Sequence, residues 1–385
     1  MLAKISSSAS DSKLHFENID ILRGFAAIIV MLYHIVVLGN FITFPHWGPF
    51  QIIRNGWMGV ILFFVISGFV ITLSLGRENI TNPITVRVNF MVRRWFRIAP
   101  LYYFTILIFV SFLQPHLIFL PARSLAAHFG THLLFIHNLF PQTQGSIDGP
   151  NWTIALEMQF YLLMALLIRK LFTWKISKLA VIFCLSAWIW RFSTTLYLEP
   201  GNSDSNIQSY LSNLLPGVLD QFLVGILLAI LWIRSEKENS KFSKLLEKSA
   251  RNFSILFLVF IVLFSLCLRM VTHIDYWGST LMIVFFRSLL AITFGLLVLA
   301  SITFPIKKLP FLLPFRYLGK ISYGIYLWHI IVLSTILDRM PWLSGYKLML
   351  TVCGFTLSLA SMSYHLIEKP MITKGQAFLK MRNKS

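Results

Sequence analysis

The sequence predicts an all-α, polytopic integral membrane protein with about ten transmembrane helices. Hydrophobic residues make up 56% of the 385 residues and charged residues only 13%, whereas soluble domains carry about 25% charged residues. The apolar residues fall in runs long enough to cross a hydrocarbon layer about 30 Å thick. These runs leave no room for a large soluble domain.

We divide the chain into a polar N-terminal tail (1–21), a transmembrane domain (22–366) and a basic C-terminal tail (367–385). The N-terminal tail lacks the apolar core and the cleavage site of a signal peptide, so we expect the first span to be retained. The expected spans are 22–42, 57–75, 98–119, 153–170, 178–197, 212–233, 253–272, 279–303, 319–337 and 346–366.

The formal net charge of +19 fits the rule that cytoplasmic loops of membrane proteins are rich in Lys and Arg. With both termini cytoplasmic, 27 of the 34 Lys and Arg residues fall in inner segments or at the inner ends of spans. The outer segments then hold only four of them: Arg54, Arg123, Arg339 and Lys347. Nucleic-acid binding is excluded as an explanation of the charge because the chain has no soluble basic module.

Two connecting segments and the cysteines complete this outline. Segment 120–152, interrupted by His128, His132 and His137, is expected to be an outer interfacial or re-entrant element, since a further span would invert every later loop. The inner loop 234–251 alternates in charge and is expected to form a short surface helix. The three cysteines have neither paired nor metal-ligand spacing, and we expect small core residues and no metal.

The first span carries the strongest functional signal, an arginine and a histidine on one helix face. Arg23 and His34 are eleven positions apart, about three helical turns and a rise of about 16 Å. If Arg23 lies at the inner surface, His34 lies near the middle of the membrane. A titratable side chain is costly at that depth unless it has partners or a function.

Span four begins with Trp152, an expected interfacial aromatic residue, and carries Glu157 about 7 Å below the outer surface. Tyr161 lies one turn further along the same face. A carboxylate in this position needs a cation or a hydrogen-bond donor. A structural ion pair is the alternative to a functional role.

Span nine carries a polar stripe formed by Ser322, Tyr326 and His329 at helical spacing. His329 is expected at a depth similar to that of His34, so the two histidines are candidates to line one polar cavity. The alternative is that His329 is an internal hydrogen-bonding residue that joins helices.

Two groups of arginines are candidate anion sites. Arg94 and Arg97 share a helix face at the inner surface, where paired guanidinium groups suit phosphate recognition, although ordinary positive-inside anchors have the same pattern. Arg191, Arg269 and Arg287 fall in outer half-spans and predict a basic vestibule for an anionic ligand. Pairing with Asp220 and with helix dipoles is the competing account.

Six segments, in order, resemble the membrane-bound acyltransferase family three and cover most of the chain. They are LRGFAAIIVMLYHI (Leu22–Ile35), FFVISGFVIT (Phe63–Thr72), RRWFRIAP (Arg93–Pro100), WTIALEMQFY (Trp152–Tyr161), GKISYGIYLWH (Gly319–His329) and HLIEKP (His365–Pro370). Two departures stand out. Met158 replaces the second acid that many relatives carry after the glutamate, and Thr153 replaces a serine.

The resemblance implies a membrane O-acyltransferase in the bacterial cytoplasmic (inner) membrane. Family members transfer acetyl or other short acyl groups from cytoplasmic acyl-coenzyme A to hydroxyls of lipopolysaccharide, other polysaccharides or peptidoglycan. The family motifs imply that His34, Glu157 and Arg23 are catalytic and that Arg94 and Arg97 bind the donor. The carbohydrate acceptor, which some systems link to a lipid, is then expected to contact Ser322, Tyr326, His329, Trp152, Arg269 and Arg287. The short C-terminal tail is typical of the stand-alone form, without a fused esterase-like domain.

Two other function classes fit part of the pattern. About ten spans with buried charges also describe a transporter of a saccharide or small anionic solute, which would need no acyl-coenzyme A. A non-catalytic partner of a polysaccharide exporter would tolerate replacement of His34.

Overall fold

The computed structural model describes residues 17–78, 82–201, 204–235, 251–303 and 315–383, together with residues 244, 247, 249 and 312. Throughout these ranges the chain forms helices and no strand, which confirms the predicted all-α class. The long helices are α2 (Glu17–Leu38), α4 (Met58–Gly76), α5 (Pro83–Phe112), α7 (Trp152–Thr173), α8 (Ile176–Tyr197), α10 (Leu215–Ser235), α12 (Phe253–His273), α13 (Arg287–Thr303), α15 (Ser322–Arg339) and α16 (Gly345–Ser363).

Each predicted span overlaps one of these long helices. Eight candidate spans in the described ranges are long and apolar enough to cross a membrane, and they include neither α7 nor α15. These two helices carry Glu157 and His329, and such polar side chains lower mean hydropathy. The integral membrane class is confirmed, while the number of spans stays a prediction.

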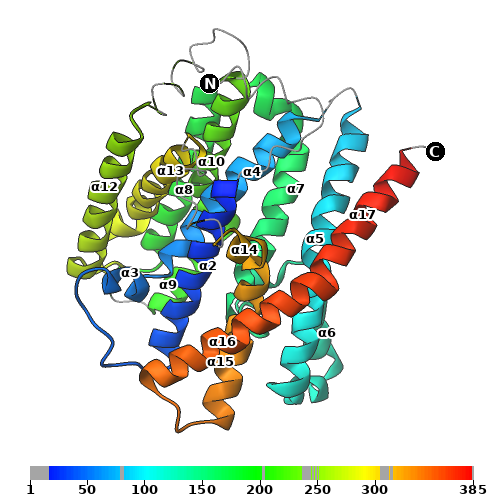
Figure 1. The fold of residues 1–385 in the computed structure, drawn as a ribbon, viewed down its shortest axis with the longest axis vertical. Coiled ribbons are helices and arrows are strands. Elements are labelled where there is room, and N and C mark those ends of the chain that lie inside the picture. Colours follow the sequence, from blue (N-terminus) through cyan, green and yellow to red (C-terminus); the bar gives the residue numbers. More distant parts are fainter. Residues whose placement is uncertain are drawn as a thin grey trace.

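Helix α2 occupies the centre of the bundle (Figure 1). It packs on α4, α13, α15 and α16, and on two short helices, α3 (Phe50–Arg54) and α14 (Phe315–Lys320). Helix α12 lies at the edge of the bundle. Only 11% of its most apolar stretch is buried inside the protein. The central position of α2 places His34 among several helices instead of on a lipid-facing surface.

Helices α4 and α10 cross in backbone contact because each has a glycine at the crossing. A Cβ atom on Gly68 would lie 2.1 Å from the Phe222 carbonyl oxygen, and one on Gly225 would lie 1.9 Å from the Val65 oxygen. Small residues permit such close approach of membrane helices, where van der Waals packing drives association. The crossing fixes the position of Ser67, which precedes Gly68 on α4.

The third predicted span, 98–119, is shifted toward the C-terminus relative to helix α5. Helix α5 starts at Pro83, where the Asn82 side chain accepts hydrogen bonds from the backbone N–H groups of Ile84 and Thr85. It ends at Phe112, and Pro115–Phe119 forms a separate 3-10 turn, η1. Hydropathy missed the first half of α5 because that half is amphipathic and basic. Arg94 and Arg97 are therefore helical and lie within α5.

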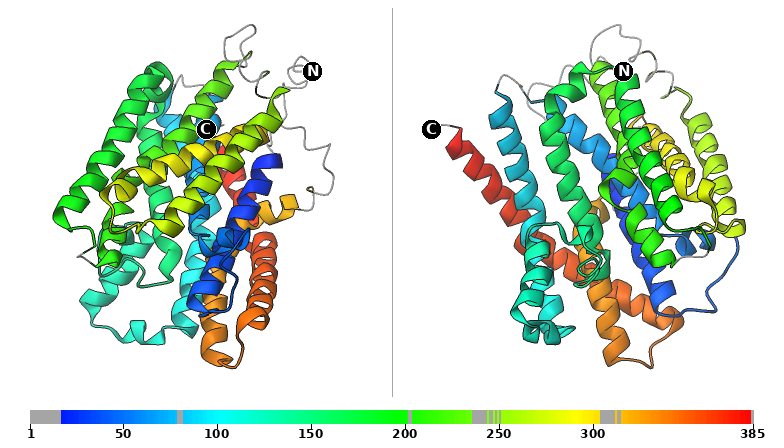
Figure 2. Two further views of the ribbon diagram at one scale, coloured as in Figure 1. Left: turned by 90° about the vertical axis from the view of Figure 1, so that its left-hand side faces the viewer. Right: turned by 180° about the vertical axis from the view of Figure 1, so that it is seen from behind.

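The C-terminal helix continues past the expected boundary at residue 366. A π turn, η7 (Tyr364–Glu368), joins α16 to α17 (Lys369–Arg382), so that one long helix crosses the molecule obliquely (Figures 1 and 2). The wider turn accommodates Pro370, which lacks a backbone N–H. Helix α17 packs along α5, where Arg382 donates to Asn89.

Segment 120–152 forms no long helix. It contains α6 (Ala122–Leu133) and two 3-10 turns, η2 (His137–Leu139) and η3 (Gly149–Asn151). The Leu133 carbonyl accepts a hydrogen bond from Tyr103, and Phe135 accepts one from Gln159 of α7. Since Tyr103 lies about 14 Å before the end of α5, the segment returns into the bundle, as expected of a re-entrant element. The predicted helix in 234–251 lies almost wholly outside the described residues.

Candidate active site

His34 on α2 and His329 on α15 are in direct contact. Nδ1 of His34 lies 3.0 Å from Nε2 of His329, and the ring centroids are 5.0 Å apart. Nδ1 of His329 lies 2.6 Å from the backbone carbonyl oxygen of Tyr326. His329 is buried, with 1% exposed, whereas His34 is half-buried. The similar depth predicted for the two histidines therefore corresponds to a hydrogen-bonded pair.

The other two residues of the α15 stripe bond within the protein. The Ser322 hydroxyl donates to the Gly319 carbonyl, 2.8 Å away. The Tyr326 hydroxyl accepts a hydrogen bond from Thr153 (2.8 Å) and donates to the Pro150 carbonyl (3.2 Å). These contacts anchor α15 to the start of α7. Binding of a substrate by Ser322 or Tyr326 stays a prediction.

Glu157 is held by hydroxyl groups. Ser67 of α4 donates to Oε1 at 2.5 Å, and Tyr161 donates to Oε2 at 3.0 Å. Neither bond involves His34, whose ring partner is His329. Sequence reasoning did not single out Ser67, although a hydroxyl within the apolar run of α4 was an available signal.

Three arginines lie close to Glu157 or to Tyr161, its hydrogen-bond partner. Arg23 is close enough to Arg97 and Glu157 for electrostatic interaction, and Arg94 interacts with the same two residues. The Arg94 guanidinium also lies over the Tyr161 ring, 5.4 Å from its centroid. All three arginines are half-buried. Among the described residues, neither Arg23 nor Arg97 has a side-chain hydrogen bond, and Asp20 interacts electrostatically with Arg23.

Glu368 is a second acid near these arginines. It lies in the π turn η7, is 5% exposed, and interacts electrostatically with Arg97 and Arg23. Its Oε1 atom has no hydrogen-bond partner among the described residues. The arginine cluster therefore faces a buried carboxylate on the C-terminal helix as well as Glu157.

A second group of buried polar side chains lies in the re-entrant segment. The rings of His132 and His137 stack in parallel, with centroids 4.0 Å apart. Burial lowers the pKa of His132 to about 4 and that of His137 to about 3. Burial raises the pKa of Asp148 to about 8. Near neutral pH both rings are therefore uncharged, and the Asp148 carboxyl is substantially protonated.

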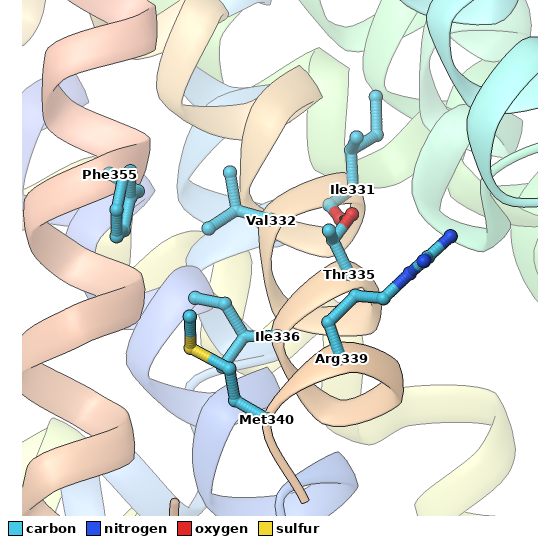
Figure 3. A pocket seen from close by; sticks show the side chains of 7 residues that line it. All are labelled: Ile331, Val332, Thr335, Ile336, Arg339, Met340 and Phe355. Atoms are coloured by element: carbon cyan, nitrogen blue, oxygen red, sulfur yellow. Dashed lines mark hydrogen bonds between the residues drawn. The ribbon is translucent and has the colours of Figure 1, made fainter.

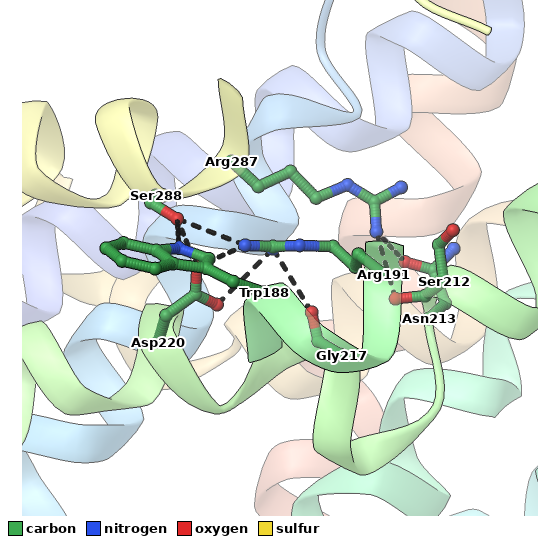
Figure 4. Close-up of polar contacts among 8 residues, drawn as sticks. All are labelled: Trp188, Arg191, Ser212, Asn213, Gly217, Asp220, Arg287 and Ser288. Atoms are coloured by element: carbon green, nitrogen blue, oxygen red, sulfur yellow. Dashed lines mark hydrogen bonds and ion pairs between the residues drawn. The ribbon is translucent and has the colours of Figure 1, made fainter. Parts of the chain in front are cut away.

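The outer arginines are largely engaged within the protein (Figure 4). Arg191 donates to both carboxylate oxygens of Asp220, at 2.6 and 3.4 Å, and to Gly217 and Ser288. Arg287 donates to the Asn213 side chain at 2.6 Å. These contacts favour the structural account for Arg191 and Arg287, and the basic vestibule stays a prediction.

The remaining predicted acceptor residues lie apart from the histidine pair. Trp152 is half-buried at the start of α7 and packs against the main hydrophobic core. Arg269 is exposed on the peripheral helix α12, beside His273 in a shallow hollow. The structure brings neither residue into contact with His34.

An open groove of about 210 Å³ lies beside the C-terminal half of α15 (Figure 3). Its lining is mostly apolar: Ile331, Val332, Thr335, Ile336, Arg339, Met340 and Phe355. None of these is a predicted site residue. We assign the groove no part in the chemistry.

Helix α2 connects the two parts of the candidate site. Arg23 belongs to the arginine cluster and His34 to the histidine pair, separated along the helix axis by a rise of about 16 Å. An anion bound by the arginines would thus lie about 16 Å along the helix axis from the imidazole of His34. A ligand with an extended arm could span that distance. This arrangement suits a donor that carries phosphates at one end and a reactive group at the other.

Comparison with known proteins gives a consistent result. A family model described as an acyltransferase domain matches residues 16–364. YrhL of Bacillus subtilis is 29% identical over 94% of this chain and 55% of that protein. The peptidoglycan O-acetyltransferase OatA of Listeria monocytogenes is 27% identical over 94% of this chain and 57% of that protein. The O-acetyltransferase OatA of Staphylococcus aureus is 26% identical over 94% and 58%, respectively.

The chain thus spans somewhat more than half the length of these curated relatives. No solved structure matches it significantly.

Proposed function

Because this chain belongs to the membrane-bound acyltransferase family three, we propose that it is a membrane O-acyltransferase that moves an acetyl group from acetyl-coenzyme A to a hydroxyl of an extracytoplasmic carbohydrate. The observation that carries the proposal is the contact between His34 and His329 within the bundle. The transporter alternative has no support among the comparisons. Peptidoglycan, named for the Listeria relative, is the first acceptor to test.

Acyl transfer from a thioester to an alcohol needs a base for the alcohol proton and stabilisation of the developing oxyanion. His34 is the candidate base, and a transient acyl-His34 is the covalent alternative. The bond from the acceptor oxygen to the acyl carbon forms as the carbon–sulfur bond breaks. The proton removed from the hydroxyl ends on the leaving thiolate.

The donor site is proposed at the arginine cluster. Arg94 and Arg97 would bind the phosphates of acyl-coenzyme A from the cytoplasmic side, with Arg23 next to them. Guanidinium groups form paired, charge-assisted hydrogen bonds to phosphate. The pantetheine arm is extended, so the thioester would reach His34 while the nucleotide stays at the inner face.

Glu157 is proposed to act near the donor and not on the imidazole. Its carboxylate accepts from Ser67 and Tyr161 and lies among the cations that would hold the phosphates. In that position it balances the charge of Arg23 and Arg94 while the donor site is empty. Met158, where many relatives carry a second acid, is buried and apolar, so this balance rests on one carboxylate on α7.

The direct test replaces His34 by alanine and measures O-acetylation of envelope glycans by mass spectrometry. The rate should fall by at least about 10²-fold, the usual contribution of a general base, with the protein still in the membrane. His273→Ala on the exposed end of α12 is the matched control. Near-normal acetylation in the His34→Ala strain would refute the proposed function.

A further inference from the structure

We propose that His329 is a positioning residue that fixes the tautomer of His34 and so makes Nε2 of His34 the reactive nitrogen. The inference rests on the proposed acyl transfer and adds to it the identity of the reacting atom. It gives His329 a role different from the substrate contact expected from the sequence. The argument follows the hydrogens through three consecutive polar groups.

The first group is the Tyr326 carbonyl, which can only accept a hydrogen bond. Nδ1 of His329 lies 2.6 Å from this oxygen and therefore carries a hydrogen. A neutral imidazole has one N–H and one lone pair, so Nε2 of His329 is the acceptor. The hydrogen bond to the backbone of α15 thus ensures that Nε2 of His329 faces His34 with a lone pair.

The lone pair on His329 in turn selects the tautomer of His34. Nδ1 of His34 lies 3.0 Å from Nε2 of His329, and two lone pairs at that distance would repel. Nδ1 of His34 therefore donates, and Nε2 of a neutral His34 is left unprotonated.

This order has a chemical consequence for the transfer step. Nε2 of His34 takes the proton of the acceptor hydroxyl, and the oxygen attacks the thioester carbon. The imidazolium that forms still donates through Nδ1 to His329, now in a stronger, charge-assisted bond. When the carbon–sulfur bond breaks, the thiolate takes the proton from Nε2 and His34 returns to its starting tautomer.

A histidine is suited to this position because it is neutral. A carboxylate beside His34 would add an unpaired charge to the interior of the bundle, which is costly to bury. His329 orients the base with a lone pair and leaves the resting pair uncharged. Glu157, the acid on α7, is hydrogen-bonded to Ser67 and Tyr161 and not to His34.

The test compares two substitutions of similar size in the full chain, reconstituted in nanodiscs. His329→Leu removes the acceptor, so His34 is free to place its hydrogen on either nitrogen. We expect kcat to fall by about 10²-fold, with the KM for acetyl-coenzyme A little changed. His329→Gln supplies an amide oxygen as acceptor and should recover part of the rate. Thr335→Val on the same helix is the control.

A second readout does not depend on activity. ¹⁵N NMR of histidine-labelled protein, with the His34 signals assigned by their loss in His34→Ala, should show a hydrogen on Nδ1 of His34 and none on Nε2. His329→Leu should convert this to a mixture of tautomers. An Nε2–H signal for His34 in the unmodified protein, or wild-type kcat in His329→Leu, would overturn the inference. Inactive His34→Ala together with fully active His329→Leu would refute only this inference, whereas active His34→Ala would refute the proposed function.

Discussion

The Arg191–Asp220 pair offers a quantitative test of whether the outer arginines are structural. We consider Asp220→Asn, which keeps the shape of the side chain and removes its charge. Arg191 is 0% exposed and Asp220 2% exposed, so solvent screens neither group. The amide can accept from only one side, and its NH₂ group would face the guanidinium as a second donor.

The cost follows from leaving a buried cation without its counter-ion. Removing one member of a buried ion pair destabilises a protein by about 3–5 kcal/mol. The Ser288 hydroxyl donates to the same carboxylate oxygen as Nη2 of Arg191, so the single amide oxygen of the variant has to serve both donors. The double substitution Arg191→Met with Asp220→Leu removes both charges, and we expect it to recover most of the loss.

The measurement is thermal unfolding in detergent, together with acetyl transfer at a temperature where each variant is folded. Asp220→Asn should unfold at a clearly lower temperature, whereas Arg269→Met on the exposed face of α12 should change stability by less than about 0.5 kcal/mol. Normal stability of Asp220→Asn with a selective loss of acceptor use would refute this reasoning. The pair would then belong to a substrate vestibule.

Three further outcomes are expected. Replacing both Arg94 and Arg97 by lysine keeps the charge but removes the paired donors, so affinity for acyl-coenzyme A should fall by about 1.5–3 kcal/mol for each lost charge-assisted bond, and unchanged affinity in nanodiscs would return both residues to the role of anchors. The pKa of Asp148, raised to about 8 in the fold from 3.8, means that its contribution to stability is complete below pH 3.8 and is lost as the pH rises through 8. Asp148→Asn should therefore flatten the fall in melting temperature between pH 3.8 and 8, and an identical pH dependence in the variant would contradict the assignment. Gly225→Ala should destabilise the bundle because its Cβ would lie 1.9 Å from a carbonyl oxygen of α4, whereas Gly354→Ala, with nothing within 4 Å, should be neutral or stabilising in size-exclusion and melting assays.

Hydrophobic patterning predicted the helices well where their apolar runs were continuous. The predicted span 57–75 and α4 differ by one residue at each end. Patterning failed where a helix continues through polar sequence, as in the first half of α5. At Pro370 a π turn keeps the C-terminal helix continuous, and sequence spacing contains no signal for such a turn.

The candidate site was predictable only within each helix. Helical spacing correctly gave the similar depth of His34 and His329, and depth was enough to suggest their meeting. Spacing says nothing about how helices are rotated relative to one another. That rotation decides that Glu157 meets Ser67 of α4 and that His329 lies against His34.

The ion pair between α8 and α10 also bears on how this protein enters the membrane. Arg191 is synthesised before Asp220, and a lone arginine costs about 2.5–3.5 kcal/mol at the centre of an inserting helix. Helix α8 alone is therefore a poor candidate for release into lipid, whereas α8 together with α10 presents a neutral pair. We expect the translocation machinery to retain α8 until α10 has emerged from the ribosome, so that the two helices leave as one unit.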